Sequence, residues 1–397
     1  MRLKDISILT PQYTGKDIES EVSFVPMECL RYGKIEQRSI PFKEAKGKYT
    51  YFGEGDLLIA KVTPCFENGN VAIANKLANG IGFGSSEIFV LRINENATAE
   101  YMFYLSQTSD FKDQACSTMC GVGGLKRISP LFMRTYEWNL PNLRNQKKIV
   151  LYLKEKTEFI DNTISILTKK RNYYTRLKSS IINNVVTRGL DEKVEFKDSG
   201  IDWIGMIPAH WNCIRTKDII QMIKGKTPTD FTFEEIGSPY LNMDYLRDRE
   251  DKPILYPTNS EGLVEIEGNE ILVLWDGANA GEFIFSKKGY LGSTMAMLKI
   301  DERVYNKRYF YALLKNIEST SKYFANGTTI PHFDSNVLLG YSYPVPPLEE
   351  QLEIANYLDE KCVKIDAAIA NIDKQIDAMK RLKRALINEV VTGKREA

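Results

Sequence analysis

Apolar side chains recur every four and then every three positions along two long stretches of the chain, 153–185 and 358–390. This is the spacing of a heptad repeat, in which one side of a helix is apolar. Neither stretch contains glycine or proline, whereas proline stands just ahead of each and glycine follows each. The pattern predicts two long helices packed through an apolar seam. The predicted seam residues are Leu153, Ile160 and Leu167 in the first helix and Leu358, Ile365 and Ile372 in the second.

The two stretches are copies of one element. With a constant offset of 205 positions and no gap, residues 141–187 match residues 346–392 at 20 of 47 positions. A gap-free match of this length predicts one structural unit used twice. An antiparallel pair leads the chain directly from one globular block to the next, whereas a parallel pair would send it back along the whole helix. We therefore expect an antiparallel coiled coil with pseudo-twofold symmetry and a globular block at each end.

Charges on the long helices bear on their packing and their surroundings. Arg171, Lys178 and Lys383 interrupt the seam, where polar residues can fix the register or mark a divergence of the helices. Residues 141–190 carry 11 basic and 3 acidic side chains, whereas residues 191–345 carry 17 and 23. The basic helix could face DNA or a protein partner, and we favour the partner. The acidic block argues against a nucleic-acid binder, so composition alone does not indicate one.

The blocks ahead of the two helices are weakly alike. Apolar strands opened by glycine, GDLLIAKV (55–62) and GNEILVLW (268–275), occur in both, and each block continues through a helix to a glycine-containing loop. Strands with a helix on one side predict two related α+β domains. We divide the chain into a first domain (1–140), a first long helix (141–190), a linker with a second domain (191–344) and a second long helix (345–397).

Composition limits the class of protein. The chain has 397 residues, of which 26% are charged and 43% hydrophobic, and a formal net charge of +1, as in ordinary globular proteins. No apolar run is long enough for a membrane span, and the N-terminal segment lacks the apolar core of a secretory signal. We therefore expect a cytoplasmic protein that does not enter a membrane.

No catalytic motif is convincing. The GKT at 225–227 is not preceded by the glycine that a phosphate-binding loop needs at position 220. The Asn/Asp-Pro-Pro-aromatic motif usual in amino-methyltransferases does not occur. Six scattered cysteines and two histidines do not predict a metal site. His332 stands in a loop, where it could contact a base or a phosphate, or be a packed or solvated residue. The chain is therefore expected to be non-catalytic.

Three segments carry a resemblance to a known family: LPNLRNQKKIVLYL (140–153), VPPLEEQLEIANYL (345–358) and KDSGIDWIGMIPAHW (197–211). Together with the two variable blocks, they make the chain resemble the specificity subunit of type I restriction–modification systems over essentially its whole length. The first helix start departs from the fuller PPLEEQ form, and no copy of the third segment stands ahead of the first block.

The resemblance implies two target recognition domains, each reading half of a bipartite site in double-stranded DNA, with the helices as a spacer between them. It implies two methyltransferase subunits that flip out adenine and methylate it at N6 with S-adenosylmethionine. It also implies restriction subunits that use ATP and Mg²⁺ for translocation and cleavage. No cofactor is expected on this chain.

Candidate site residues follow from the loops and the helix starts. Arg or Lys commonly contacts guanine, and Asn contacts adenine. The DNA-contact candidates are Lys126 and Arg127 in the first domain, and Asn326, Thr328, Thr329 and His332 in the second. The partner-contact candidates at the helix starts are Gln146, Tyr152, Gln351 and Tyr357. Two rival readings are a non-DNA coiled-coil scaffold carrying two ligand-binding domains, and a free-standing enzyme.

Overall fold

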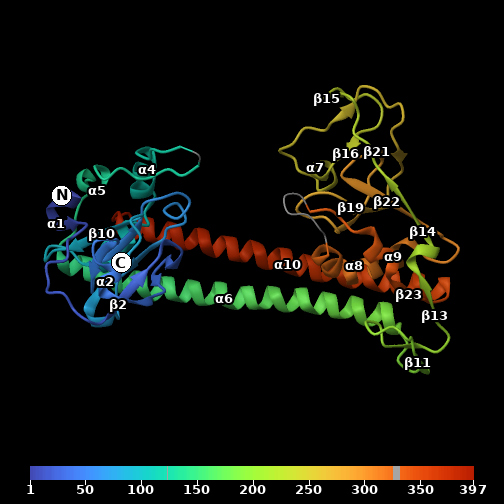
Figure 1. Ribbon diagram of the computed structural model, residues 1–397, viewed down its shortest axis with the longest axis horizontal. Helices are drawn as coiled ribbons and strands as arrows, with labels where there is room; N and C mark the ends of the chain where they lie inside the picture. The colour runs from blue at the N-terminus through green and yellow to red at the C-terminus, as the bar shows by residue number, and fades with distance from the viewer. Residues whose placement is uncertain (123, 325–330) are drawn as a thin grey trace. The chain divides into compact units, whose positions relative to one another are not determined.

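The chain folds into two compact units of mixed α and β structure. The computed structural model describes residues 1–122, 124–324 and 331–397. Unit 1 comprises Met1–Lys169 with Asp373–Ala397, and unit 2 comprises Lys170–Ile372. The two long helices are α6 (Leu143–Arg188) and α10 (Leu348–Val391). Each of them contributes one part to each unit (Figure 1). The predicted pair of long helices and the α+β class are confirmed.

Unit 1 contains two four-stranded sheets. The antiparallel sheet β1-β10-β7-β8 is formed by Ser7–Leu9, Ile88–Ile93, Leu57–Ala60 and Val71–Ile73. The sheet β5-β2-β9-β6 is formed by Arg38–Pro41, Glu21–Val25, Ile81–Gly84 and Thr50–Gly53, with β2 and β9 parallel. The other elements are β3 (Leu30–Arg31), β4 (Lys34–Ile35), α1 (Leu3–Ile6), α2 (Phe42–Ala45), α3 (Ala99–Leu105), α4 (Ser109–Ser117), α5 (Phe132–Thr135), and the 3-10 helices η1 (Met27–Cys29) and η2 (Ala78–Gly80).

Unit 2 repeats this plan with shorter strands in its second sheet. The antiparallel sheet β14-β22-β19-β20 is formed by Ile220–Lys224, Met295–Ile300, Ile271–Leu274 and Phe283–Phe285. The sheet β16-β21-β18 is formed by Tyr240–Leu241, Gly289–Leu291 and Glu265–Ile266, with β16 and β21 parallel. The other elements are β11 (Phe196–Asp198), β12 (Met206–Pro208), β13 (Asn212–Arg215), β15 (Phe231–Thr232), β17 (Tyr256–Pro257), β23 (Ser342–Val345), α7 (Met243–Leu246), α8 (Lys307–Tyr323), α9 (Ser335–Gly340) and the 3-10 helix η3 (Thr216–Asp218).

The central strands of the two units are equivalent. β7 and β19 come from the two glycine-opened apolar runs, and every residue of both strands is buried, as strands covered on both faces require. Each is paired on one side with a long antiparallel strand, in the registers Leu58↔Val90 and Leu272↔Met297. The same strand order around these positions confirms that the two domains are related.

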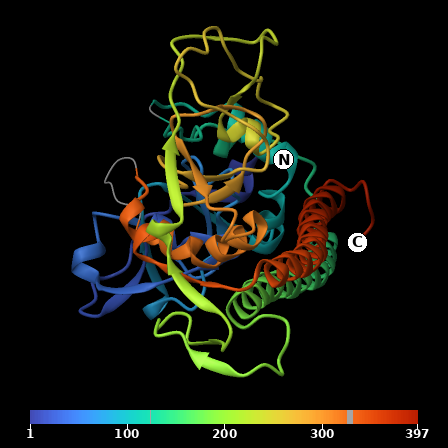
Figure 2. The same cartoon turned by 90° about the vertical axis from the view of Figure 1, so that its right-hand side faces the viewer.

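The long helices complete the core of each unit. In unit 1, Leu153 and Ile160 of α6 lie in one apolar cluster with Leu386 and Val390 of α10. In unit 2, the equivalent cluster contains Val185, Val186, Ile354, Ala355 and Leu358. Of the six predicted seam residues, five are buried and Leu167 is half-buried. An early segment of one helix therefore packs on a late segment of the other in each unit, which makes the pair antiparallel (Figures 1 and 2).

Two ion pairs join the helices at equivalent positions. In unit 1, Lys383 Nζ donates to both carboxylate oxygens of Asp161, at 2.7 and 2.8 Å. In unit 2, Lys178 Nζ donates to Asp366 at 2.7 and 2.6 Å. Lys383 follows Lys178 by 205 positions, and Asp366 follows Asp161 by the same number. The two lysines that interrupt the predicted seam thus form matched interhelical bonds, so the sequence repeat is kept down to single side-chain contacts.

None of the helices in the described part of the chain combines the length and the apolar character needed to cross a bilayer.

Candidate nucleic-acid interface

The loop of the first domain is fastened to the end of its central strand. Backbone hydrogen bonds join Cys120 and Arg127 in both directions, at 3.1 and 2.9 Å, and close the loop at its base. Arg127 also forms a bridge with Val62, just beyond β7. Thr63 Oγ1 donates to the carbonyl of Gly124 at 2.9 Å and accepts from the Lys126 N–H at 3.0 Å. The loop therefore projects from a defined platform.

Lys126 and Arg127 differ in their surroundings. Lys126 is exposed. The Arg127 guanidinium donates to both carboxylate oxygens of Glu87, at 2.8 and 2.9 Å, and this hydrogen bonding lowers the pKa of Glu87. Lys61 lies beside them, donates to the carbonyl of Ser86 at 2.6 Å, and has its pKa lowered by burial. Lys126 is thus open to a ligand, whereas Arg127 is already held by a carboxylate.

The predicted loop of the second domain ends at the matching place. His332 forms a bridge with Asp276, just beyond β19, and its Nδ1 lies 2.6 Å from Asp276 Oδ1. Lys224 Nζ is 3.7 Å from the other oxygen of Asp276 and 5.0 Å from the centre of the Trp275 ring. Asn326, Thr328 and Thr329 lie outside the described residues.

Arg127 and His332, at the described ends of the two loops, are therefore held at equivalent positions. The Val62↔Arg127 bridge follows β7, and the Asp276↔His332 bridge follows β19. Sequence reasoning named candidates in the loops but did not name the residues of the sheet and its edges that lie beside them. These are Lys61, Thr63 and Glu87 in unit 1 and Lys224, Trp275 and Asp276 in unit 2. Most of them come directly after the matched runs GDLLIAKV and GNEILVLW or inside them, which was a signal available from the sequence.

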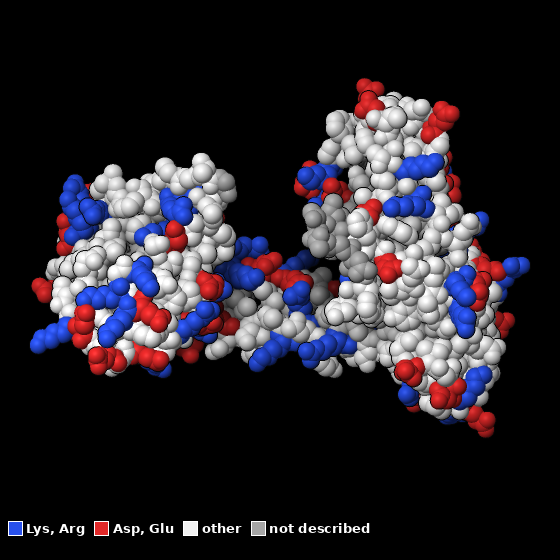
Figure 3. Space-filling view, viewed as in Figure 1, with Lys and Arg blue, Asp and Glu red and all other residues white. Residues whose placement is uncertain are grey.

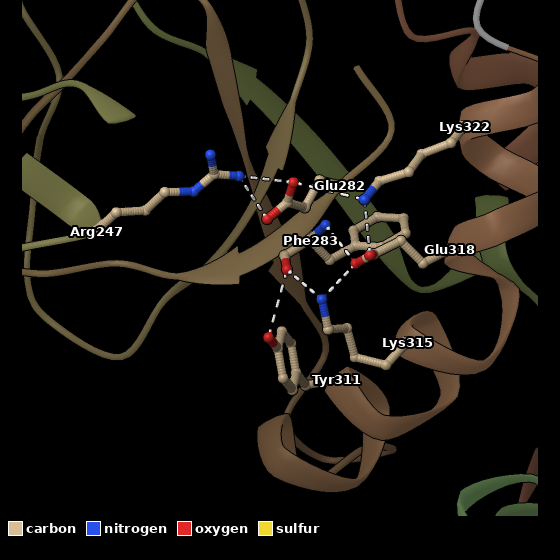
Figure 4. Close-up of polar contacts among 7 residues, drawn as sticks. All are labelled: Arg247, Glu282, Phe283, Tyr311, Lys315, Glu318 and Lys322. Atoms are coloured by element: carbon tan, nitrogen blue, oxygen red, sulfur yellow. Dashed lines mark hydrogen bonds and ion pairs between the residues drawn. The ribbon is translucent and has the colours of Figure 1, made fainter. Parts of the chain in front are cut away.

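A partly exposed polar network braces the sheet of the second domain (Figure 4). Glu318 of α8 accepts from the Phe283 N–H of β20 at 3.1 Å, and Lys315 Nζ donates to the Phe283 carbonyl at 3.1 Å. Burial by itself would raise the pKa of Glu318, but the hydrogen bonds from Lys315 and Phe283 outweigh it and lower that pKa. β20 is the neighbour of β19, so this network fixes the strand from which the Asp276 site extends.

The same network reaches the segment after α7. Arg247 donates to both carboxylate oxygens of Glu282, at 2.9 and 2.8 Å, and Lys322 lies 3.0 Å from Glu318. Gly281 permits this close packing, because a Cβ there would lie 2.8 Å from the backbone carbon of Ser321 at the end of α8. The network thereby ties α8 and the sheet edge at β20 to the segment that follows α7.

The two glutamines of the helix starts are buried and act within the chain. Gln146 donates to the carbonyls of Asn96 and Pro141, at 3.1 and 2.8 Å, and accepts from the Thr98 N–H at 3.0 Å. Thr98 caps the N-terminus of α3. Neither side chain is presented to a partner, so the structure gives Gln146 and its copy Gln351 an internal role.

Gln351 repeats the pattern in unit 2. It donates to the carbonyls of Val304 and Pro346, at 2.8 and 2.9 Å, and accepts from the N–H of Asn306 at 2.7 Å. Asn306 caps the N-terminus of α8. Each glutamine therefore ties a long helix to the first turn of the helix that packs on the sheet.

Tyr152 and Tyr357 are half-buried against the cores of their units. Each ring lies under a lysine one helical turn later, Lys156 at 5.7 Å and Lys361 at 5.4 Å. Part of each ring is accessible at the surface of its helix. The structure thus leaves the tyrosines available to a partner, in contrast to the glutamines.

The linker ahead of the second domain is docked on the start of α10. Trp211 is fully buried, and its Nε1 donates to Glu350 at 2.8 Å. His210 Nε2 lies 2.7 Å from the other oxygen of Glu350. Two of the segments that carried the family resemblance therefore meet at one carboxylate.

Charge is dispersed over the visible surface. On the face shown in Figure 3, basic and acidic side chains of the described residues are interspersed in both units and do not form one large positive patch. Such a surface can supply individual hydrogen-bonding groups to DNA, but it would neutralise few phosphates. The arrangement suits recognition through a few placed side chains.

Comparison with known proteins gives a consistent result. The MjaVIII specificity subunit of a type I restriction enzyme from Methanocaldococcus jannaschii is 38% identical over 188 residues, or 47% of this chain and 43% of the relative. The EcoEI specificity subunit from Escherichia coli is 34% identical over 152 residues, or 37% of this chain and 26% of the relative. These matches span less than half the length of either relative. The putative MjaX specificity subunit from M. jannaschii is 23% identical over 408 residues, covering 99% of this chain and 92% of the relative.

Solved structures share the fold. One described as "Structural basis underlying complex assembly and conformational transition of the type I R-M system" has a TM-score of 0.75 at 18% identity, covering 100% of this chain and 97% of its own. The HsdS subunit from Thermoanaerobacter tengcongensis has a TM-score of 0.50 at 19% identity, covering 100% and 96%. The sequence model described as "Type I restriction modification DNA specificity domain" matches residues 4–173 and 208–380. Since these regions take in both domains and most of both long helices, this chain belongs to the type I restriction modification DNA specificity domain family.

Proposed function

We propose that this chain is the sequence-specificity subunit of a type I restriction–modification complex, and that each domain reads one half of a bipartite site in double-stranded DNA. One observation carries the proposal. Two related domains hold different side chains at equivalent positions, Lys126 with Arg127 in one and His332 with Asp276 in the other. Equivalent scaffolds with unlike chemistry suit the reading of two unlike half-sites. The family match favours this function over a non-DNA scaffold.

The remaining activities belong to partners. We assign methylation of adenine to two methyltransferase subunits that bind S-adenosylmethionine, and translocation and cleavage to restriction subunits that bind ATP and Mg²⁺. Bases would be extruded into the methyltransferase active site. This chain would be non-catalytic and cytoplasmic, and its long helices would set the gap between the half-sites and dock the methyltransferases.

An apolar stripe on α6 supports the docking role. We define it as Leu151, Phe159 and Ile166, which are 72%, 69% and 65% exposed. Residues seven or eight apart return to the same side of a helix, so the three side chains lie along one line in unit 1. Residues 143–169 carry six basic and three acidic side chains, which favours an acidic partner surface. Exposed apolar side chains in a row are typical of a protein interface.

The test is to map methylated adenines in cells that express this chain with a methyltransferase subunit of a type I restriction–modification system. We expect one motif made of two half-sites separated by an unspecified gap. Replacing residues 216–341 by the corresponding domain of a relative should change one half-site and leave the other intact. Methylation that persists without this chain, or that follows an uninterrupted motif, would contradict the proposal.

A further inference from the structure

Arg127 and His332 make the same kind of contact in their two domains. They lie 205 positions apart, which is the offset of the helix repeat, and each forms a bridge just beyond a central strand. A carboxylate holds each of them. Glu87 accepts two hydrogen bonds from Arg127, and Asp276 Oδ1 lies 2.6 Å from His332 Nδ1. The residue at this position is therefore fixed by an acid in both units.

The two carboxylates come from unrelated positions. Glu87 stands directly ahead of β10, whereas Asp276 follows β19. Counting from the glycines that open the two apolar runs puts Thr63 at the place of Asp276. The same count and the strand registers give Glu87 the counterpart Met295. The likeness of the two domains does not explain the shared contact, which points to a requirement of the site itself.

A lysine stands beside each contact, on the face of an aromatic ring. Lys61 Nζ lies 4.7 Å from the centre of the Phe89 ring. Lys224 Nζ lies 5.0 Å from the centre of the Trp275 ring and 3.7 Å from Asp276. A ring face attracts a cation above it, which limits the positions of a long and flexible side chain. The cationic groups around each carboxylate are thus restricted in position.

Stability does not explain why an acid recurs here. The side chains of Arg127 and His332 are 50% and 57% exposed, and exposed pairs of this kind contribute little to the free energy of unfolding. A carboxylate on a DNA-binding surface also repels phosphates and lowers affinity. An acid that adds little stability and opposes binding is expected where it raises specificity instead.

On the basis of the function proposed above, we propose that Glu87 and Asp276 are positioning residues for base recognition, one in each domain. Glu87 takes N–H groups of Nε and Nη2 from the Arg127 guanidinium, which has five, and the others can donate to guanine. Asp276 binds Nδ1 of His332, so Nε2 is the ring nitrogen that can reach a base of the other half-site. A reading group held in one orientation distinguishes bases better than a free one.

The test measures binding of the full chain, assembled with methyltransferase subunits, to oligonucleotides that differ at single base pairs of its site. Glu87→Ala should reduce discrimination at a guanine of one half-site by at least about tenfold, because Arg127 is no longer held for a bidentate contact. Affinity for DNA without the site should stay equal or rise, since a negative charge has been removed. Glu87→Gln keeps one acceptor and should lose less discrimination.

Asp276→Ala should act in the same way at one position of the other half-site. The controls remove exposed acids of the same units. Glu95→Ala lies beyond the opposite end of β10 from Glu87, and Asp218→Ala lies beyond the opposite end of β14 from Lys224. Both control proteins should keep full discrimination in both half-sites.

The outcomes separate the positioning role from the function on which it rests. A wild-type complex that does not recognise a two-part site would contradict the proposed function itself. A two-part site that both alanine variants read as strictly as the wild type would overturn the positioning role alone. Equal loss of discrimination at both half-sites would also overturn it, as would weaker binding to every DNA with discrimination intact, because these are the effects of a damaged fold.

Discussion

At the scale of single residues, the structure separates groups that the sequence treats alike. Lys126 and Arg127 are adjacent basic residues, yet one is exposed and the other is bonded through two nitrogens to Glu87. Gln146 and Tyr152 come from one motif, yet the amide is buried and the phenol half-buried. What a polar residue does depends on which groups the fold brings within about 3 Å of it.

Lys126→Ala combined with Arg127→Ala should weaken reading of one half-site only. The exposed Lys126 would contact DNA directly, while loss of Arg127 leaves Glu87 unpaired beside the DNA and adds repulsion. Methylation of a set of oligonucleotides with changes in one half-site or the other measures the effect. We expect relaxed discrimination in one half and unchanged discrimination in the second, with Lys48→Ala as an exposed control from the same unit. Equal loss at both halves would contradict the assignment.

Glu318→Gln should lower the free energy of unfolding by about 2 kcal/mol at pH 7, because charged hydrogen bonds to a mostly buried carboxylate are lost. The folded-state pKa of Glu318 lies below its unfolded value, so the carboxylate stabilises the fold at every pH above about 4.3. That stabilisation is lost as the pH falls through the lower, folded-state pKa.

Urea unfolding of the wild type and of Glu318→Gln between pH 7 and pH 3 checks this. The difference between the two proteins should be constant at neutral pH and shrink only in the acid range. Glu234→Gln, at an exposed position of the same unit, should behave as wild type throughout. A stability difference that grows on acidification would contradict a lowered pKa of Glu318 in the folded state.

At the scale of elements, a repeated sequence makes matched contacts without making equal surfaces. Each long helix keeps its interhelical Asp–Lys ion pair and its buried glutamine. The outer side diverges, since the apolar stripe of α6 is replaced in α10 by Asn356, Lys364 and Asn371. The Asp–Lys pairs and the glutamines are the same in both helices because they make contacts within the chain. The exposed stripe residues make no such contacts, so they can differ according to what binds each helix.

Phe159→Lys with Ile166→Asn copies the α10 residues into the α6 stripe. If the stripe docks a methyltransferase subunit, this change should reduce the affinity of one of two subunits by at least about tenfold, since two apolar side chains would no longer be buried. Mass photometry across a titration resolves the one-to-one and two-to-one complexes. Ile8→Lys, at an exposed apolar position of unit 1 away from the helix, is the control. Unchanged affinity at both steps would exclude the stripe from docking.

At the scale of the whole molecule, the division of each long helix between two units suggests where length can be changed. The unit boundary falls after Lys169 in α6 and after Ile372 in α10. Contacts described within each unit, including both interhelical ion pairs, lie on one side of these points. An insertion there would leave both reading surfaces intact.

Inserting one heptad after Lys169 and another after Ile372 should lengthen the spacer by about 10 Å, which equals about three base pairs of DNA. Genome-wide mapping of methylated adenines should show both half-sites unchanged and the gap between them wider. A seven-residue insertion after Leu190, in the linker, serves as the control and should leave the gap as it was. An unchanged gap after the double insertion would remove the spacer role.

The sequence by itself determined the two long helices, their repeat and the related strand runs of the two domains. Heptad periodicity and the gap-free match are local properties that survive without knowledge of the fold. The sequence did not predict the pairing of Lys178 with Asp366 or of Lys383 with Asp161. These opposite charges lie 188 and 222 positions apart, and no sequence pattern marks such a pair.

Only the tertiary structure decided which loop residues are free, which are bonded and which sheet residues join them. It placed Arg127 on Glu87, set His332 on Asp276 and buried both motif glutamines. The physical reason is that periodicity reports which side of an element is apolar, whereas hydrogen bonds and cavities depend on distances between segments that only folding brings together.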